Sequence, residues 1–489
     1  MPSSDTIIRN ATIIDGTGGP RFAGDIAIAG DRITALGRLD GWKGAREIDA
    51  SGLVASPGFI DAHTHDDRLL FADPQVKAKA SQGVTTVVVG NCGISLAPFA
   101  AAGAAPPPPL DLIGSAADYK YRRYGEYLED LDGSPAALNS LGMVGHSTLR
   151  VGVMDRLDRA ATDKEIAVMR ERALDSVADG AIGLSTGLFY APANAAPTAE
   201  VAALCAPLAA MGALYVTHMR DEAEGIIGSL DETFAIGRDA HVPAIVSHHK
   251  CAGIKNHGRS PETLAHISAA MAHQPIGLDC YPYSASSTVL RPDMVARSSK
   301  VIVTWSKARP DFAGMELSEI ARLMDCTDLE AVPKLQPAGA IYFQMSEDDM
   351  RRILAFPPTM VGSDGLPHDQ HPHPRLWGTF PRVLGRYCRE EKLFDLETAV
   401  HKMTGLTAKN FGIRNRGTLA VGAFADVTLF DPATVIDRAD FAHPTEPSVG
   451  IVLTMVNGTP VWEKGRATGA RPGRALRRGR DAGRSWSAA

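Results

Sequence analysis

The sequence predicts an α/β protein: a (β/α)₈ TIM-type barrel with a small β-sandwich domain formed from both chain termini. In the middle of the chain, short apolar runs such as "TTVVVG" and "PAIVSHH" alternate with helix-like segments such as "DKEIAVMRERALDSVADG". This alternation is typical of βα units around a parallel sheet. Near both ends, β-branched runs are instead broken by Gly and Asn-Gly turns, which indicates short antiparallel strands. The 489 residues leave room for a barrel of roughly 250 residues and further units.

The order of these patterns along the chain predicts the domain boundaries. We expect the barrel at 57–410 and the β domain at 1–56 and 411–470. The segment 284–345 is longer than an ordinary βα connection, and long loops inside compact domains are often functional, so we expect a lid-like insertion over the active face. The Ala/Pro-rich stretch "APFAAAGAAPPPPLDLIG" cannot form a regular element. An Arg-rich C-terminal tail occupies 471–489.

Composition argues against several classes of protein. The net charge of −6 and the pI near 6.2 give no general reason to expect nucleic-acid binding. No apolar run approaches the roughly 20 residues that span a membrane. The start "MPSSDTIIRN" lacks a signal-peptide layout, and six scattered cysteines without a CxxC pair fit a reducing compartment, so we expect a cytoplasmic protein. The tail could be a nucleic-acid arm, but a tail draped over the surface is the favoured interpretation. Composition makes no prediction of oligomeric state.

The first strand of the predicted barrel ends in a polar cluster. The stretch "GFIDAHTHDD" at 58–67 directly follows the apolar run "LVASPGFI". Side chains at i and i+2 of a strand project to the same face, so His63 and His65 project together. Two imidazoles on one side of a strand end make a natural pair of metal ligands. Because a single His-x-His pair is common without function, the other strand ends decide what this pair means.

Four further side chains suited to metal binding or proton transfer follow other predicted strands. They are Cys92 in "VVVGNCGIS", His218 in "LYVTHMRDE", His248 in "AIVSHHKCAG" and Asp364 in "TMVGSDGLPH". In a barrel these strand ends lie on the face that carries the chemistry of barrel enzymes. Each residue has an ordinary alternative: a small buried Cys, a backbone-bonded His, or a helix N-cap for Asp. Six such residues in order favour a metal-dependent active site.

This pattern resembles the amidohydrolase superfamily, which has His-x-His after the first barrel strand, His after the fifth and sixth, and Asp after the eighth. The β domain built from both termini also matches. The motifs "VGNCGIS", "LSTGLFYAP", "SHHK", "DCYPYSASST", "GSDGLPH" and "HPRLWGTFPRVLG" narrow the resemblance to the D-aminoacylase (N-acyl-D-amino-acid deacylase) family. The resemblance covers nearly the whole chain. Dihydroorotase-like relatives hold two metals with a carboxylated Lys, for which "GAIGLSTGLFYAP" offers no convincing candidate.

The resemblance implies a zinc enzyme with one tightly bound Zn²⁺. The ligands of that ion in the family correspond to Cys92, His218 and His248. The His-x-His pair and the Asp lie beside it and are implied to complete a second, weaker metal site; these residues are His63, His65 and Asp364.

The expected chemistry follows from the difficulty of cleaving an amide. Zinc can lower the pKa of bound water to about 7 and can polarise a carbonyl oxygen. Cys92 would serve as a thiolate, since coordination deprotonates a thiol. Asp364 is the predicted general base, which takes a proton from the attacking water and delivers it to the departing amine. The alternative for Asp364 is a pure metal ligand.

The family's contacts to the substrate α-carboxylate correspond to Tyr190, Lys250 and Arg375. Arginine can pair with a carboxylate bidentately, lysine supplies a point charge, and tyrosine donates a hydrogen bond. Arg291, at the start of the insertion, could face an acidic substrate side chain or could be a surface arginine. The surface position is favoured for Arg291, so apolar D-amino acids are the first expectation for the substrate, with D-Glu and D-Asp second.

The sequence thus predicts a small-molecule enzyme that hydrolyses N-acyl-D-amino acids, without nucleic-acid or membrane partners. Two alternatives stay open at this stage. One is a cyclic-amide hydrolase of the dihydropyrimidinase or dihydroorotase kind. The other is a non-catalytic barrel that acts as a binding protein, although such proteins typically lose metal ligands.

Overall fold

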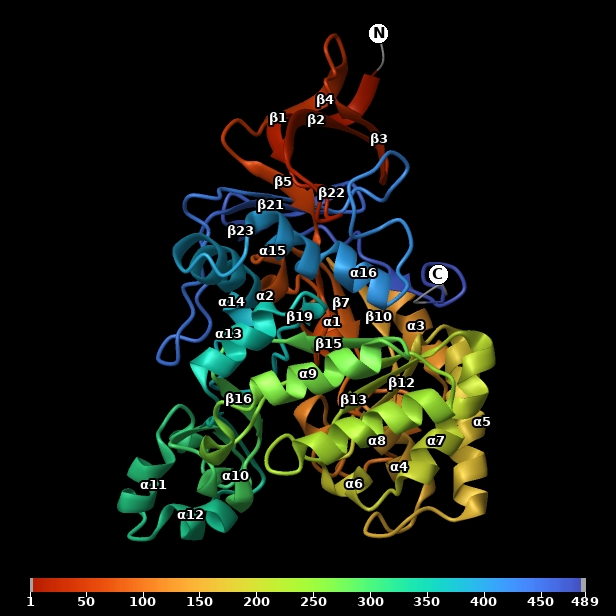
Figure 1. Ribbon diagram of the computed structural model, residues 1–489, viewed down its shortest axis with the longest axis vertical. Coiled ribbons are helices and arrows are strands. Elements are labelled where there is room, and N and C mark those ends of the chain that lie inside the picture. Colours follow the sequence, from red (N-terminus) through yellow and green to blue (C-terminus); the bar gives the residue numbers. More distant parts are fainter. Residues whose placement is uncertain (1–2, 485–489) are drawn as a thin grey trace.

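A closed parallel barrel forms the centre of the molecule (Figure 1). The computed structural model describes residues 3–484; residues 1–2 of the predicted β domain and 485–489 of the predicted tail lie outside this part. The barrel strands are β6 (Phe59–Asp61), β7 (Val84–Val89), β10 (Asn139–Gly142) with its continuation β11 (Val144–Gly145), β12 (Gly183–Gly187), β13 (Leu214–His218), β14 (Ala244–Val246), β15 (Ile276–Cys280) and β19 (Thr359–Val361).

Backbone hydrogen bonds close the barrel between its first and last strands. The amide of Ala62 donates to the carbonyl of Val361 (3.3 Å), and the amide of Asp364 donates to the carbonyl of His63 (2.8 Å). Between these ends, each strand pairs in parallel with the next one along the barrel, apart from the short break between β10 and β11. The predicted barrel is confirmed.

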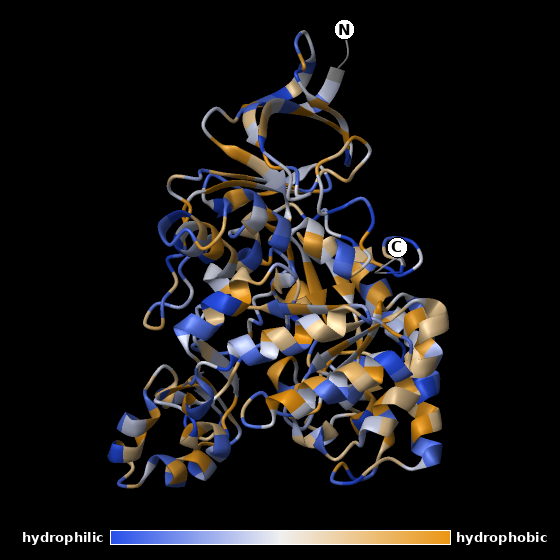
Figure 2. Cartoon of the chain, viewed as in Figure 1, coloured by the Kyte–Doolittle hydropathy of each residue, from blue (hydrophilic) through white to orange (hydrophobic). Residues whose placement is uncertain are grey.

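Burial on both faces explains why the strands read as continuous apolar runs. Every residue of β7 and of β13 is buried, as expected for parallel strands that are covered by helices outside and packed side chains inside. Figure 2 shows hydrophobic strands in the middle of the molecule and mixed colouring on the surrounding helices. The main outer helices are α3 (Tyr124–Gly133), α5 (Asp163–Asp179), α7 (Thr198–Cys205), α8 (Ile226–Asp239), α9 (Ser260–Met271), α13 (Glu347–Ala355) and α15 (Leu396–Met403).

A second sheet combines the two ends of the chain. Its order is β23-β22-β21-β20-β5-β1-β2-β3, and β4 also pairs with β1. The sheet curls until Ile33 exchanges backbone hydrogen bonds with Ala423 and Gly422 (3.0 and 2.8 Å), which precede β20. Its strands are β1 (Ser3–Ile13), β2 (Phe22–Ala29), β3 (Arg32–Gly37), β4 (Lys43–Asp49), β5 (Val54–Pro57), β20 (Val427–Phe430), β21 (Ile451–Val456), β22 (Thr459–Glu463) and β23 (Arg466–Ala467). The exact domain boundaries stay a prediction.

The long insertion has a regular structure of its own, at the lower left of Figure 1. Its three strands form an antiparallel sheet in the order β16-β18-β17, and a separate apolar core packs beneath it. The elements are β16 (Ala285–Val289), α10 (Pro292–Ala296), β17 (Lys300–Ser306), α11 (Leu317–Leu323), α12 (Asp328–Leu335) and β18 (Ala338–Phe343). Whether this unit moves as a lid stays a prediction.

The described part of the tail lies along the barrel. β24 (Ala475–Leu476) pairs in parallel with β10. The side chain of Arg477 pairs with Asp132 at 2.7 Å, and Arg474 pairs with Asp31 at 2.7 Å. Among residues 3–484, no helix is both long and apolar enough to cross a membrane.

A buried polar joint connects the terminal sheet to the barrel. Arg416 and Asp426 form an ion pair and are each 4% exposed. Asp426 also accepts hydrogen bonds from the Asn139 side chain of β10 (3.2 Å) and from the Asn457 amide (2.8 Å). The Asp426 carboxylate therefore bonds to the barrel strand β10 through Asn139 and to the C-terminal part of the chain through Arg416 and Asn457.

We predict that Asp426→Ala lowers the free energy of unfolding by about 3–5 kcal/mol, because it leaves the Arg416 guanidinium buried without its counter-charge. Urea denaturation followed by circular dichroism measures the loss. Asp158→Ala is the matched control, since Asp158 is exposed and pairs only with the neighbouring Arg156. A loss no larger than that of the control would contradict the assignment.

Candidate metal centre and substrate pocket

The six predicted metal-site residues lie together at the carboxyl ends of the barrel strands. Two overlapping groups have ligand atoms within 4.8 Å of one another. One contains Cys92, His218 and His248; the other contains His63, His65, Cys92 and Asp364. All of them are buried, and Cys92 belongs to both groups.

Short contacts centre on the cysteine sulfur. Cys92 Sγ lies 3.2 Å from His63 Nε2 and 3.4 Å from His248 Nε2. On the other side, Asp364 Oδ1 lies 3.2 Å from His65 Nε2 and 3.5 Å from His63 Nε2. The donor atoms therefore converge on a shared space rather than on separate partners.

The backbone at this cluster is strained. Cys92, His248 and Asp364 have φ values of 52°, 35° and 51°, in the left-handed region that non-glycine residues rarely adopt. Such strain persists only where the surrounding structure imposes it, and it clusters at functional sites. The turn that follows each strand thus aims its side chain inward.

The local charges favour the ionised form of two site residues. Burial opposes ionisation of Cys92, but the nearby imidazoles of His63 and His248 hold the pKa of its thiol well below the ordinary value. Burial likewise opposes ionisation of Asp364, and the charges of Arg375 and His248 hold its pKa well below the usual range. Arg375 Nη1 lies 2.8 Å from Asp364 Oδ2.

The donor set fits zinc. A thiolate with two imidazoles is a typical zinc ligand set that leaves one position free, and soft sulfur disfavours magnesium or calcium. Cys92, His218 and His248 supply this set. The buried ring nitrogens Nδ1 of His63, His65 and His218 have no hydrogen-bond partner among the described residues.

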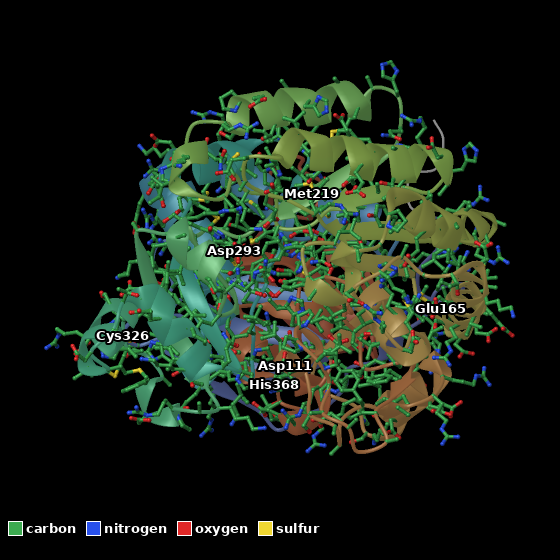
Figure 3. The ribbon with its side chains drawn as sticks, turned by 90° about the horizontal axis from the view of Figure 1, so that it is seen from below. Asp111, Glu165, Met219, Asp293, Cys326 and His368 are labelled. Atoms are coloured by element: carbon green, nitrogen blue, oxygen red, sulfur yellow. The ribbon has the colours of Figure 1, made fainter. Side chains whose placement is uncertain are left out.

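A pocket opens above this cluster. Its polar wall includes Tyr190, Lys250 and Asp364, and its apolar wall includes Phe189, Met294 and Leu366. The metal-site residues His65, Cys92, His218 and His248 also line it. The insertion contributes Ser287 and Thr288, so it forms one side of the pocket. In the view from below (Figure 3), Asp111 and His368 lie between the insertion at Cys326 and the helix that carries Glu165.

The predicted substrate-contact residues occupy different places. The Tyr190 hydroxyl lies 3.0 Å from Thr288 Oγ1, and Lys250 Nζ donates to Glu222 at 2.6 Å. Arg375 is fully buried behind Asp364 and is not itself among the lining residues. Arg291 is also absent from the pocket lining: its guanidinium pairs with Asp293 (2.9 Å) and lies 4.3 Å from the Phe189 ring.

Known proteins share this arrangement of the barrel. Residues 46–462 match the model of the amidohydrolase family. The chain belongs to the amidohydrolase family.

Individual relatives are similar over their full length. The amidohydrolase described here is 55% identical to a D-aminoacylase of Alcaligenes xylosoxydans xylosoxydans, over 97% of this chain and 98% of the relative. A solved D-aminoacylase structure, described as having a binuclear metal centre, matches with a TM-score of 0.95 and 54% identity over 97% of this chain and 100% of the other. An N-acyl-D-glutamate deacylase of Bordetella bronchiseptica, solved with zinc and a phosphonate mimic of the tetrahedral intermediate, matches with a TM-score of 0.92 and 43% identity, covering 97% of this chain and 100% of the other.

Three charged residues that line the pocket of this amidohydrolase were not predicted from the sequence: Asp221, Glu222 and Arg297. Glu222 follows β13 by four residues in "HMRDE", and its carboxylate lies among the metal-site histidines. Burial opposes its ionisation, but Lys250 and the histidines lower its pKa. Arg297, rather than Arg291, reaches the pocket wall. A carboxylate shortly after a strand-end histidine was a visible signal for Glu222; nothing in the sequence separates Arg297 from Arg291.

A buried ion-pair network supports the site from below. Lys79 Nζ donates to Asp61 (2.8 Å) and to Ser363 Oγ (2.5 Å), and it lies 3.6 Å from Asp66. Asp61 Oδ1 in turn accepts the amides of Ser363 (2.8 Å) and His63 (3.3 Å). The network ties the ends of the first and last barrel strands together, next to the metal-site residues.

We predict that Lys79→Met lowers the free energy of unfolding by about 3–5 kcal/mol, because it leaves two carboxylates buried without their counter-charge. Thermal or urea denaturation measures the effect. Lys77→Met on the same helix is the control, since Lys77 is exposed. Equal stability losses in the two variants would show that the buried pair does not support the site.

Proposed function

We propose that this chain is a zinc-dependent N-acyl-D-amino-acid deacylase, which hydrolyses a linear amide to a carboxylate and a free D-amino acid. The observation that carries the proposal is the convergence of Cys92, His218 and His248 at the base of a pocket whose wall holds the Lys250 ammonium. Such a pocket offers a metal for the amide and a cation for the α-carboxylate. The relatives that are similar over their full length, D-aminoacylase and N-acyl-D-glutamate deacylase, support the same reaction.

In this proposal one zinc is held tightly by Cys92, His218 and His248. His63, His65 and Asp364 complete a weaker second site, an assignment supported by the binuclear centre described for the solved D-aminoacylase. When bound, zinc supplies an activated water and polarises the amide carbonyl. The negative charge of the Cys92 thiolate offsets part of the charge of the ion.

Asp364 is the proposed proton carrier. Its Oδ1 faces the two histidines of the first strand, while Oδ2 is held by Arg375 at 2.8 Å. This ion pair favours the ionised carboxylate, which is the form that can accept a proton from water and then deliver it to the leaving amine. The alternative role for Asp364 is that of a metal ligand alone.

The α-carboxylate of the substrate would pair with Lys250 and with the Tyr190 hydroxyl. Arg375, the third predicted contact, is buried outside the pocket lining, where its guanidinium is engaged with Asp364 and with the carbonyl of Ser287 (3.1 Å); direct contact with the substrate stays a prediction. Fixed contacts to the carboxylate and to the amide leave one side free for the side chain. The D preference follows from the relatives rather than from these contacts.

The apolar wall supports apolar D-amino acids as the preferred substrates. Phe189, Met294 and Leu366 line the pocket, and burying an apolar side chain against them is favourable by roughly 25 cal/mol per Å². Acidic D-amino acids come second. Their side-chain carboxylate would pair with Arg297, which lines the pocket, rather than with Arg291, which does not.

Two other functions are less well supported. A cyclic-amide hydrolase with a bridging carboxylated Lys would need a lysine at the end of β12, and the residues of that strand are Gly183–Gly187, "GLSTG". A non-catalytic binding protein would have no reason to keep the complete donor set. The six cysteines are unpaired, which supports the cytoplasm as the place of action. We propose no nucleic-acid partner.

A hydrolysis screen tests the proposed reaction. Zinc-loaded protein should cleave N-acetyl-D-methionine or N-acetyl-D-leucine far faster than their L enantiomers, and a chelator should abolish the activity until zinc is restored. Release of the free amine is measured with a colorimetric amine reagent. Absence of turnover of every N-acyl-D-amino acid would refute the proposal.

Two substitutions test the assigned roles. Cys92→Ala should lose the tightly bound zinc, measured by elemental analysis after dialysis. Asp364→Asn should keep its fold and lower kcat by about 10²–10⁴-fold, because the amide cannot accept the proton. Full zinc content in the first variant, or near-normal kcat in the second, would overturn the corresponding role.

A further inference from the structure

Glu222 contacts both the metal-site histidines and the Lys250 ammonium. Its Oε1 lies 3.0 Å from Nδ1 of His248, and the same oxygen accepts a hydrogen bond from Lys250 Nζ at 2.6 Å. Its other oxygen, Oε2, lies 3.8 Å from Nε2 of His218. The side chain is 11% exposed and lines the pocket.

The backbone holds this carboxylate in place. The carbonyl of Glu222 accepts the amide of Ala252 at 2.8 Å, which joins the loop after β13 to the loop after β14. The carboxylate of Asp221 accepts the amides of Ala223 (2.7 Å) and Gly225 (3.1 Å), so the turn around Glu222 is closed on itself. The carboxylate is therefore part of a preorganised wall rather than of a free loop.

The chemistry of imidazole gives this contact a consequence. His248 turns its Nε2 toward Cys92 Sγ (3.4 Å), on the metal side. A histidine that binds a metal through Nε2 carries its proton on Nδ1, and an acceptor at Nδ1 fixes the ring and raises its basicity. Glu222 Oε1, 3.0 Å from Nδ1 of His248, is the carboxylate oxygen placed to be that acceptor. The Lys250 ammonium, 2.8 Å from the same nitrogen, then donates to Glu222 rather than to the ring.

Lys250 needs the same carboxylate for a different reason. Its ammonium is nearly buried and lies 2.8 Å from Nδ1 of His248 and 5.9 Å from the centre of the Tyr281 ring. A nearly buried ammonium is costly unless an opposite charge lies beside it. Glu222 supplies that counter-charge and holds the ammonium at the pocket wall.

We propose that Glu222 is a positioning residue that serves the metal centre and the carboxylate subsite at once, by orienting His248 for zinc and Lys250 for the α-carboxylate of the substrate. The role rests on the proposed function, since it assumes zinc at Cys92, His218 and His248 and a carboxylate-bearing substrate at Lys250. If Glu222 has this role, a single substitution of it weakens both zinc binding and substrate binding, which a local packing defect would not change together.

Glu222→Gln is the test, because it keeps the size of the side chain and removes the charge. Zinc affinity, measured without substrate by competition with a chromogenic chelator, should fall about 10–100-fold. At saturating zinc, KM for N-acetyl-D-methionine should rise at least tenfold, with a smaller change in kcat. Glu171→Gln is the matched control: the same change on an exposed side chain of α5, away from the pocket lining, should alter neither quantity.

Glu222→Asp separates positioning from simple folding. The shorter carboxylate keeps the charge but cannot reach both His248 and Lys250. Compared with Glu222→Gln, it should restore part of either the zinc affinity or the KM, but not both. Zinc affinity of Glu222→Gln equal to that of the wild type would overturn the proposal, as would weaker zinc binding with an unchanged KM. Zinc affinity is measured without substrate, so the two proposals can fail separately. A protein that binds zinc but cleaves no N-acyl-D-amino acid would refute the proposed function, while the zinc affinity of Glu222→Gln would still decide whether Glu222 orients His248.

Discussion

Parallel closure of the barrel is the constraint on which the rest of the structure depends. Since the barrel strands run in the same direction, the residues that follow them meet on one face, however far apart they lie in the chain. The amide of Asp364, after the last strand, donates to the carbonyl of His63, after the first. Cys92 then reaches histidines of both the first and the sixth strand ends. The metal centre is a product of this closure.

Gathering ionisable groups in a buried place is costly unless each charge has a partner. The structure meets this requirement with three neighbouring pairs, each serving a different part of the site. Lys79 with Asp61 (2.8 Å) ties the strand ends together, Arg375 holds Asp364 (2.8 Å), and Glu222 holds Lys250 (2.6 Å). The left-handed backbone at Cys92, His248 and Asp364 is a further cost that the packed barrel sustains.

Much of the site was predictable because its residues stand at strand ends with distinctive chemistry. His63, Cys92 and Asp364 follow apolar runs directly, so periodicity and residue type together were enough to group them. Their charged supports were not predictable in the same way. Lys79 belongs to a short helix and pairs with Asp61 across 18 positions of sequence, and nothing local indicates that its ammonium is fully buried. Arg291 and Arg297 look alike in sequence, yet only Arg297 reaches the pocket.

The sequence by itself determined the strand–helix alternation, the donor types at the strand ends and the family to which they point, because these depend on local pattern and on the identity of single residues. Tertiary structure alone decided which of these groups form ion pairs and hydrogen bonds with one another. The insertion became an antiparallel sheet with its own core that walls the pocket, and Glu222 came to lie between His248 and Lys250. Such contacts join separate loops at distances of about 3 Å, and only the packing of the whole barrel sets those distances.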